Sequence, residues 1–177
     1  MRPANPYASA LAGLRAKKVK FIVIGVSGIN YYAGDPGRIF ATQDLDLLIK
    51  PAAANLLAAL KALSGEGFEL SCNGEPVVGL GRGLARTITE RRAVITATKD
   101  RILRIDLVLD AGGIPFHDWE MGARVFKMGR AQVTVGSLVQ LIRAKENSNR
   151  KKDRAFLSLY KIQLGEMIAE ADLKKGK

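Results

Sequence analysis

Two residue types that often carry chemistry are nearly missing from this sequence. Its 177 residues include one cysteine, Cys72, and one histidine, His117. A single cysteine cannot form a disulfide within the chain, and a lone histidine without a partner at metal-ligand spacing argues against a zinc site. One histidine also gives no basis for assigning a Ser-His-Asp arrangement. Any catalytic chemistry must therefore come from other side chains.

Long apolar runs are missing too. The longest near the N-terminus, FIVIGV, is far shorter than the roughly 20 residues that a membrane helix needs. The opening stretch MRPANPYASALAGLRAKK lacks the apolar block of a signal peptide. Together with the single cysteine, these features predict a cytoplasmic protein without a membrane partner. Hydrophobic residues still make up 47% of the chain, so it can bury a core.

Acidic residues are scarce relative to basic ones. The chain has 28 lysines and arginines against 17 aspartates and glutamates, which gives a net charge of +11. The basic residues gather in residues 15–20, 143–154 and 174–177. The charge alone is compatible with an ordinary soluble surface. Its clustering favours an anionic partner such as nucleic acid, a nucleotide or an acidic protein.

The order of the expected elements predicts an α/β or α+β fold. Strands are expected over 20–25, 42–50, 68–72, 77–81, 91–100, 101–110 and 132–137. Helices are expected over 8–18, 51–63, 137–149 and 151–173, with a further short helix after a Ser27 cap and a flexible loop over 79–86. We therefore predict a mixed β-sheet flanked by helices in a core of residues 1–136, and a C-terminal helical pair over residues 137–177.

Two aspartates in an apolar strand are the main local anomaly. Asp44 and Asp46 lie in DLDLLI, although aspartate is depleted in strands. Alternate residues of a strand point to one side, so both carboxylates project together while Leu45 and Leu47 face a core. Carboxylates this close repel each other unless a cation lies between them, and hard ions such as Mg²⁺ bind carboxylate oxygens. The alternative is an exposed edge strand that its acids keep soluble.

A later strand repeats this pattern. Asp106 lies within RILRIDLVLD, where Arg104, Asp106 and Val108 share one face. If this strand lies beside the first, three carboxylates converge. Asp110 is on the same face but precedes AGG, where aspartate is typical of a turn, so we prefer Asp106. Upstream, Gly25 ends an apolar strand where GVSG begins a helix, and the free N–H groups of a helix start suit a phosphate.

Together these features resemble the DNA polymerase beta-like nucleotidyltransferase superfamily. Its pattern is an apolar strand, Gly-Gly or Gly-Ser, a short helix, an Asp-x-Asp strand and a third carboxylate on a later strand. The similar segments here are FIVIG, ATQDLDLLI and RIDLVLD. Small bacterial members, including the toxin component of type IV toxin–antitoxin (phage-exclusion) systems, also have a Thr before Asp-x-Asp and a late S-L-x-x-L-I-x-x-K … R-x-K-D segment. Thr42 and SLVQLIRAKENSNRKKD resemble these features.

The resemblance implies an enzyme. It implies that a nucleoside monophosphate is transferred from an NTP to a hydroxyl of a protein, an RNA or a small molecule. Mg²⁺ or Mn²⁺ would be the cofactor, and in the toxin subgroup a cognate antitoxin would be a partner. The residues implied to hold the metal and to act in catalysis are Asp44, Asp46 and Asp106. The residues implied to bind the nucleotide are Gly25, Ser27, Thr42 and Lys145.

The late segment leaves two roles open. Lys145 shares an apolar helical stripe with Leu138 and Leu141. A lysine on that face either binds an anion, which the resemblance makes a nucleotide phosphate, or reaches past the stripe into solvent. Lys152 and Asp153 are further candidates for the site, although Asp153 is also favoured simply as an acidic residue near a helix N-terminus.

Departures from the family pattern keep a second function open. Val26 occupies the position of the second Gly or Ser of the turn, which weakens a phosphate contact unless Ser27 takes over, and DPGRIF lengthens the loop that follows. The alternative is a catalytically inactive nucleotidyltransferase-fold module that binds nucleic acid or an acidic partner protein. A dinucleotide-binding turn, suggested by Gly25-x-x-Gly28, is less consistent because Tyr31 occupies the third glycine position.

Overall fold

The computed structural model describes residues 5–128 and 131–173 as a mixed α/β fold. The strands are β1 (Phe21–Ile24), β2 (Leu45–Ile49), β3 (Glu69–Cys72), β4 (Glu75–Pro76), β5 (Ile95–Lys99), β6 (Leu103–Val108), β7 (Arg124–Met128) and β8 (Ala131–Val135). The helices are α1 (Ala8–Ala16), α2 (Gly25–Asn30), α3 (Ala53–Gly65), α4 (Arg82–Arg91), α5 (Phe116–Gly122), α6 (Leu138–Ser148), α7 (Lys151–Leu159) and α8 (Lys161–Leu173), with a short 3₁₀ turn η1 (Pro36–Arg38).

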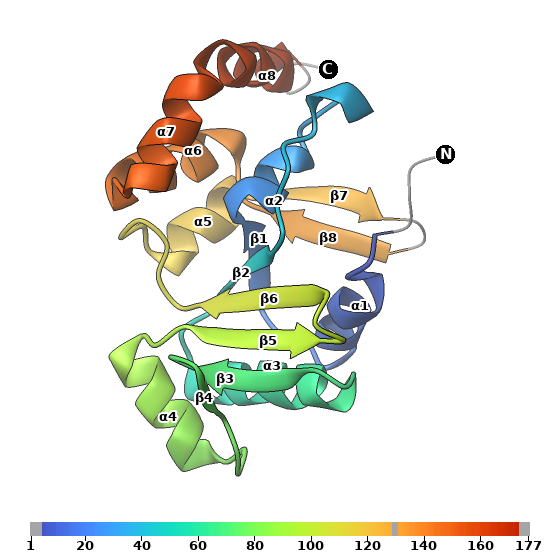
Figure 1. Ribbon diagram of the computed structural model, residues 1–177, viewed down its shortest axis with the longest axis vertical. Coiled ribbons are helices and arrows are strands. Elements are labelled where there is room, and N and C mark those ends of the chain that lie inside the picture. Colours follow the sequence, from blue (N-terminus) through green and yellow to red (C-terminus); the bar gives the residue numbers. More distant parts are fainter. Residues whose placement is uncertain (1–4, 129–130, 174–177) are drawn as a thin grey trace.

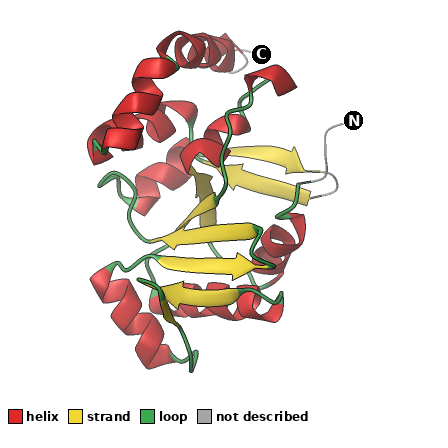
Figure 2. Cartoon of the chain, in the orientation of Figure 1, coloured by secondary structure: helices red, strands yellow, loops and turns green. Residues whose placement is uncertain are grey.

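The strands form one sheet in the order β4-β3-β5-β6-β2-β1-β8-β7. β1 pairs in parallel with β8 and β2 pairs in parallel with β6, whereas the other neighbouring pairs are antiparallel. Helices flank this sheet, as Figure 2 shows. The predicted fold class, a mixed sheet flanked by helices with a C-terminal helical pair, is therefore confirmed.

The centre of the sheet is apolar on both faces. Every residue of β1 is buried, and so are the residues of β2 except Asp46. Such continuous apolar runs are typical of strands covered on both sides. In Figure 1, α3 lies behind the lower strands and α7 lies above the sheet, while α2 lies at the height of β7 and β8 and packs against β1 and β2. None of the described helices is both long and apolar enough to cross a membrane.

The predicted hairpin between residues 91–100 and 101–110 is present. β5 and β6 pair antiparallel, and Asp100 and Arg101 turn the chain with φ angles of +54° and +56°. Two successive positive φ angles produce the turn whose twist matches that of the flanking strands. The predicted cap of α6 is also present, because the Ser137 hydroxyl accepts a hydrogen bond from the backbone N–H of Gln140 at 3.2 Å.

Two predicted helix boundaries were wrong. α2 begins at Gly25 and not after a Ser27 cap, because Gly25 has a φ of +68° and turns the chain directly out of β1. The single helix expected over 151–173 is broken at Tyr160 into α7 and α8. This break lets the Tyr160 ring pack 4.6 Å from the centre of the Phe40 ring, a contact that sequence periodicity does not encode.

The middle of the chain contains more helix than expected. Residues 77–81 form no strand, because Gly79, with a φ of +66°, bends the chain away after β4. The expected loop over 79–86 contains the start of α4, which is stabilised by burial of Ala85 and Ile88 where α4 packs on α3. The sequence also did not predict α5 or β7. The basic stretch 174–177 lies outside the described residues.

The C-terminal helices hold the long loop between α2 and β2. Arg38 forms ion pairs with Glu170 at 2.6 Å and Glu166 at 2.9 Å, both on α8. Phe40 packs its ring against Phe156 and Tyr160, with ring centres 5.1 and 4.6 Å away. The loop that leads into β2 is therefore positioned by residues more than a hundred positions later in the chain.

This aromatic contact predicts a loss of stability on truncation. Phe40 is 4% exposed, so Phe40→Ala is expected to lower the free energy of unfolding by about 3 kcal/mol. Urea denaturation followed by circular dichroism measures the change. Ile39→Ala is the matched control: Ile39 is 57% exposed and should change stability by less than about 0.5 kcal/mol. Equal effects of the two substitutions would contradict the anchoring role of Phe40.

Candidate metal centre

Three aspartates from two neighbouring strands lie together at one end of the central sheet. Asp44 directly precedes β2, Asp46 lies within β2 and Asp106 lies within β6. β2 and β6 run parallel in a register that places Asp46 beside Asp106. One carboxylate oxygen of each aspartate lies within 4.8 Å of the other two. Among the described residues, this is the cluster of acidic, histidine or cysteine side chains whose spacing allows a shared metal ion.

Gly25 leaves the space that these carboxylates occupy. It follows Ile24, the β1 residue that pairs with Asp46. A Cβ atom at position 25 would lie 2.1 Å from Oδ2 of Asp46, and the φ of +68° is also unfavourable for any other residue. The glycine turn predicted for a phosphate therefore lies directly against the aspartates.

Two hydroxyl groups hold the loop before β2. Thr42 Oγ1 lies 3.2 Å from the carbonyl oxygen of Asp44 and 3.3 Å from its Oδ1. Ser27 Oγ donates to the same carbonyl oxygen at 3.3 Å. Both predicted nucleotide-binding hydroxyls thus contact Asp44, and they fix the direction from which its carboxylate enters the site.

Asp106 is held by donors from two strands. Thr96 of β5 donates its hydroxyl to Oδ1 at 2.8 Å. Arg104, two residues earlier on β6, donates Nε to Oδ1 at 3.2 Å and Nη2 to Oδ2 at 3.1 Å. The sequence pattern did not identify either Thr96 or Arg104 as a residue of the site. The signal for Arg104 was its position on the same strand face as Asp106, whereas Thr96 depends on the pairing of β5 with β6.

The opposite wall comes from the C-terminal helices. Asp153 is 1% exposed and accepts hydrogen bonds from Ser148 and Arg150 at 2.7 Å and from Lys145 at 3.0 Å. The Lys145 ammonium also lies 5.1 Å from the centre of the Phe156 ring. Burial by itself would raise the pKa of Asp153, but these hydrogen bonds lower it to about 2. Lys145 therefore has an anionic partner within the protein, and its ammonium is held in a defined position.

A cleft of about 550 Å³ separates the two walls. Its lining includes Asp44, Asp46 and Asp106 on one side and Lys145 and Lys152 on the other. Carboxylates and ammonium groups therefore face the same space. An arrangement of this kind suits a ligand that carries both a divalent cation and several negative charges.

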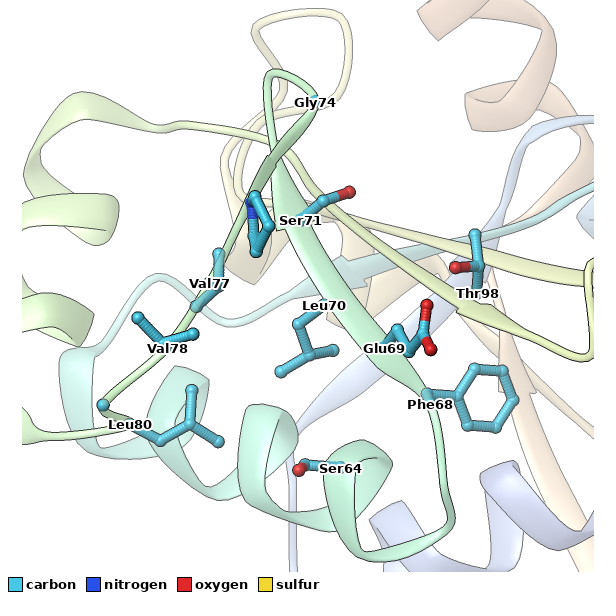
Figure 3. Close-up of a pocket in the computed structure, with 12 residues that line it drawn as sticks. Ser64, Phe68, Glu69, Leu70, Ser71, Gly74, Val77, Val78, Leu80 and Thr98 are labelled. Carbon is cyan, nitrogen blue, oxygen red and sulfur yellow. The ribbon is translucent and has the colours of Figure 1, made fainter.

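Another hollow, of about 740 Å³, lies at the β3 edge of the sheet and contains no comparable chemistry (Figure 3). The segment with Val77, Val78 and Leu80 runs alongside β3 there and contributes mostly apolar side chains. Glu69 is the single titratable residue in its lining. The cleft with the aspartates is therefore the better candidate for a functional site, although it is the smaller of the two.

The aspartate cluster is electrostatically unfavourable without a cation. Burial, together with the negative charges of Asp44 and Asp106, raises the pKa of Asp46 to about 6. Lys145 and Lys152 act in the opposite direction but do not cancel it. A hard divalent cation bound by carboxylate oxygens would relieve this repulsion. The residues present therefore fit Mg²⁺ or Mn²⁺.

Comparisons with known proteins assign no family to this chain. No protein-family model matches it, and no curated protein matches its sequence. The function is therefore inferred from the geometry of the cleft together with the sequence pattern.

The raised pKa of Asp46 predicts a pH-dependent gain in stability for Asp46→Asn. Well below pH 4, Asp46 is protonated in both the folded and the unfolded chain. As the pH rises from about 4 to about 6, this carboxyl ionises in the unfolded chain but stays protonated in the folded wild type, so the folded state loses stability until Asp46 itself ionises near pH 6. In metal-free buffer, we expect Asp46→Asn to be more stable by about 2 kcal/mol at pH 8 and nearly equal at pH 4. Urea denaturation at both pH values measures this.

The control for that experiment is Asp100→Asn, in the exposed turn between β5 and β6. It removes one negative charge without touching the cluster. A gain at pH 8 as large as that of Asp46→Asn would show that the effect reflects net charge and not the local repulsion.

A second prediction concerns the space at Gly25. Gly25→Ala is expected to displace the Asp46 carboxylate and to weaken binding of Mn²⁺ at least about tenfold, since a metal ligand would move. Gly74→Ala is the matched control. Its φ of +84° imposes a similar backbone cost, but no atom lies within 4 Å of the added methyl group. Calorimetric titration with Mn²⁺ separates the two, and equal losses would mean that backbone strain alone is responsible.

Proposed function

We propose that this protein is a Mg²⁺-dependent nucleotidyltransferase that transfers a nucleoside monophosphate from an NTP to a hydroxyl of a protein, an RNA or a small molecule. The observation that carries this proposal is the meeting of Asp44, Asp46 and Asp106 beside the Gly25 turn. The sequence pattern of the superfamily calls for these groups in this order. The facing Lys145 and Lys152 supply positive charge where a triphosphate would lie.

The metal would be held by the three aspartates. When bound, Mg²⁺ or Mn²⁺ would neutralise charge on the triphosphate and on the leaving pyrophosphate. The protein contributes preorganised positions: the ammonium of Lys145 is fixed by Asp153, and the turn at Gly25 leaves room for the Asp46 carboxylate in the cluster. Positioning and charge stabilisation account for most of the catalysis in phosphoryl transfer.

The proposed reaction balances without a further reagent. The acceptor oxygen forms a bond to the α-phosphorus of the NTP, the bond from that phosphorus to the bridging oxygen breaks, and pyrophosphate leaves. We further propose that Asp106, the carboxylate that β6 contributes to the cluster, accepts the hydroxyl proton. Membership of the toxin subgroup, and with it a cognate antitoxin, is supported by Thr42 before the Asp-x-Asp pair and by the late motif that contains Lys145 and Asp153.

Labelled nucleotides test the proposal. The protein is incubated with each of the four α-³²P-labelled NTPs, Mg²⁺ and cell extract, and the labelled macromolecule or small molecule is identified. We expect transfer with the wild type and a loss of about 100-fold or more for Asp44→Asn and for Asp106→Asn. Asp100→Asn, outside the cleft, should retain full activity.

Two other outcomes would overturn the proposal. One is the absence of labelling with any NTP, combined with no thermal stabilisation by NTP and Mg²⁺ together. The other is binding of RNA or DNA that depends steeply on salt and survives Asp44→Asn and Asp46→Asn. The second result would identify the protein as an inactive module, the alternative that Val26 in the glycine turn leaves open.

A further inference from the structure

Arg104 binds the same carboxylate that the metal would need. It lies on β6 two residues before Asp106, and its guanidinium donates from Nε and Nη2 to both oxygens of Asp106, at 3.2 and 3.1 Å. The side chain of Asp106 is 13% exposed and that of Arg104 is 53% exposed. Among the ion pairs of the described residues, the pair of Arg104 with Asp106 is the one that includes an aspartate of the cluster.

A guanidinium and a divalent ion compete at this position. A carboxylate offers about four lone-pair positions, and Thr96 together with the two nitrogens of Arg104 already uses three at Asp106. A metal ion would also lie close to a fixed positive charge, which repels it. In the metal-free protein, Arg104 therefore supplies part of the charge that balances the cluster, and it opposes the entry of the metal.

The guanidinium is able to leave Asp106 without disturbing the core. The Arg104 side chain is half exposed, so it can turn into solvent once its two-pronged contact with Asp106 breaks. Lys145 differs in this respect, because its partner Asp153 is buried and lies outside the cluster. Arginine binds phosphate oxygens through the same two-pronged geometry that it uses for carboxylates. A substrate phosphate near the cluster is therefore a competing partner for Arg104.

We propose that Arg104 couples metal binding to the arrival of the phosphate-bearing substrate. Without substrate it occupies Asp106. When a triphosphate enters the cleft, the guanidinium moves to a phosphate oxygen and Asp106 becomes available to the divalent ion. Metal and triphosphate then bind tightly only together. This inference rests on the proposed function, since it assumes that the aspartates hold a metal and that the ligand carries a triphosphate.

The test compares two affinities in wild type and Arg104→Gln. Calorimetry measures the Kd of Mn²⁺ alone and the Kd of the preformed complex of Mn²⁺ with inorganic triphosphate, the part common to all NTPs. We expect Arg104→Gln to bind Mn²⁺ alone about tenfold more tightly, because a repelling charge is gone. The same variant should bind the complex about tenfold more weakly, because a phosphate ligand is gone. Arg86→Gln, an exposed arginine of α4, controls for net charge and should change both values less than about twofold.

The opposite signs of the two changes are the decisive feature. If both affinities fall together, Arg104 only orders the carboxylates, and the inference is wrong. It is equally wrong if neither affinity changes. If the wild type, Arg104→Gln and Asp46→Asn all fail to bind Mn²⁺, both alone and as the triphosphate complex, the metal site itself is absent and the proposed function fails with it. Thermal unfolding of each variant confirms that the proteins compared are folded.

Discussion

The parallel pairing of β2 with β6 is the constraint on which the candidate site depends. It places Asp46 and Asp106 side by side on neighbouring strands, which lie about 4.8 Å apart in any sheet. The register is held by the other face, where Leu45 and Leu47 pair with Ile105 and Leu107 and all four are buried. A slip of one residue would expose these apolar side chains and turn Asp106 into the core. The energy of the core therefore maintains a contact between like charges that would not form by itself.

Positively charged side chains partly offset the repulsion among these aspartates, one by direct contact and two from across the cleft. Arg104 binds Asp106 directly, and Lys145 and Lys152 reduce the repulsion at Asp46 from across the cleft. These cations do not restore an ordinary pKa, because burial first and the charges of Asp44 and Asp106 second still raise the pKa of Asp46 to about 6. Stability and the proposed metal binding therefore oppose each other here: the folded chain would be more stable without the clustered carboxylates that are proposed to bind the ion. Such a trade-off is common at functional sites and rare on ordinary surfaces.

Most of the fold and the centre of the site could be predicted from local patterns. Alternation along β2 and β6 correctly predicted which aspartates share a face, and the Ser137 cap correctly marked the start of α6. The failures share a cause. α4 is stabilised by its contact with α3, and the break at Tyr160 accompanies packing on Phe40, so both depend on partners far away in the chain. Local propensity carries no information about such partners.

By itself, the sequence determined the chemical identity of the site: two aspartates in strands and a third directly before one, a glycine at the end of β1 and a lysine on an apolar helical stripe. Periodicity is sufficient for this, since the direction of a side chain within one element depends only on that element's geometry. Only the tertiary structure decided which of these residues contact each other. It assigned Lys145 to Asp153, gave Asp106 to Arg104 and Thr96, and made Gly25 necessary through its contact with Asp46. Most of these contacts join residues of different helices, strands and loops, so their distances depend on how all the elements pack together.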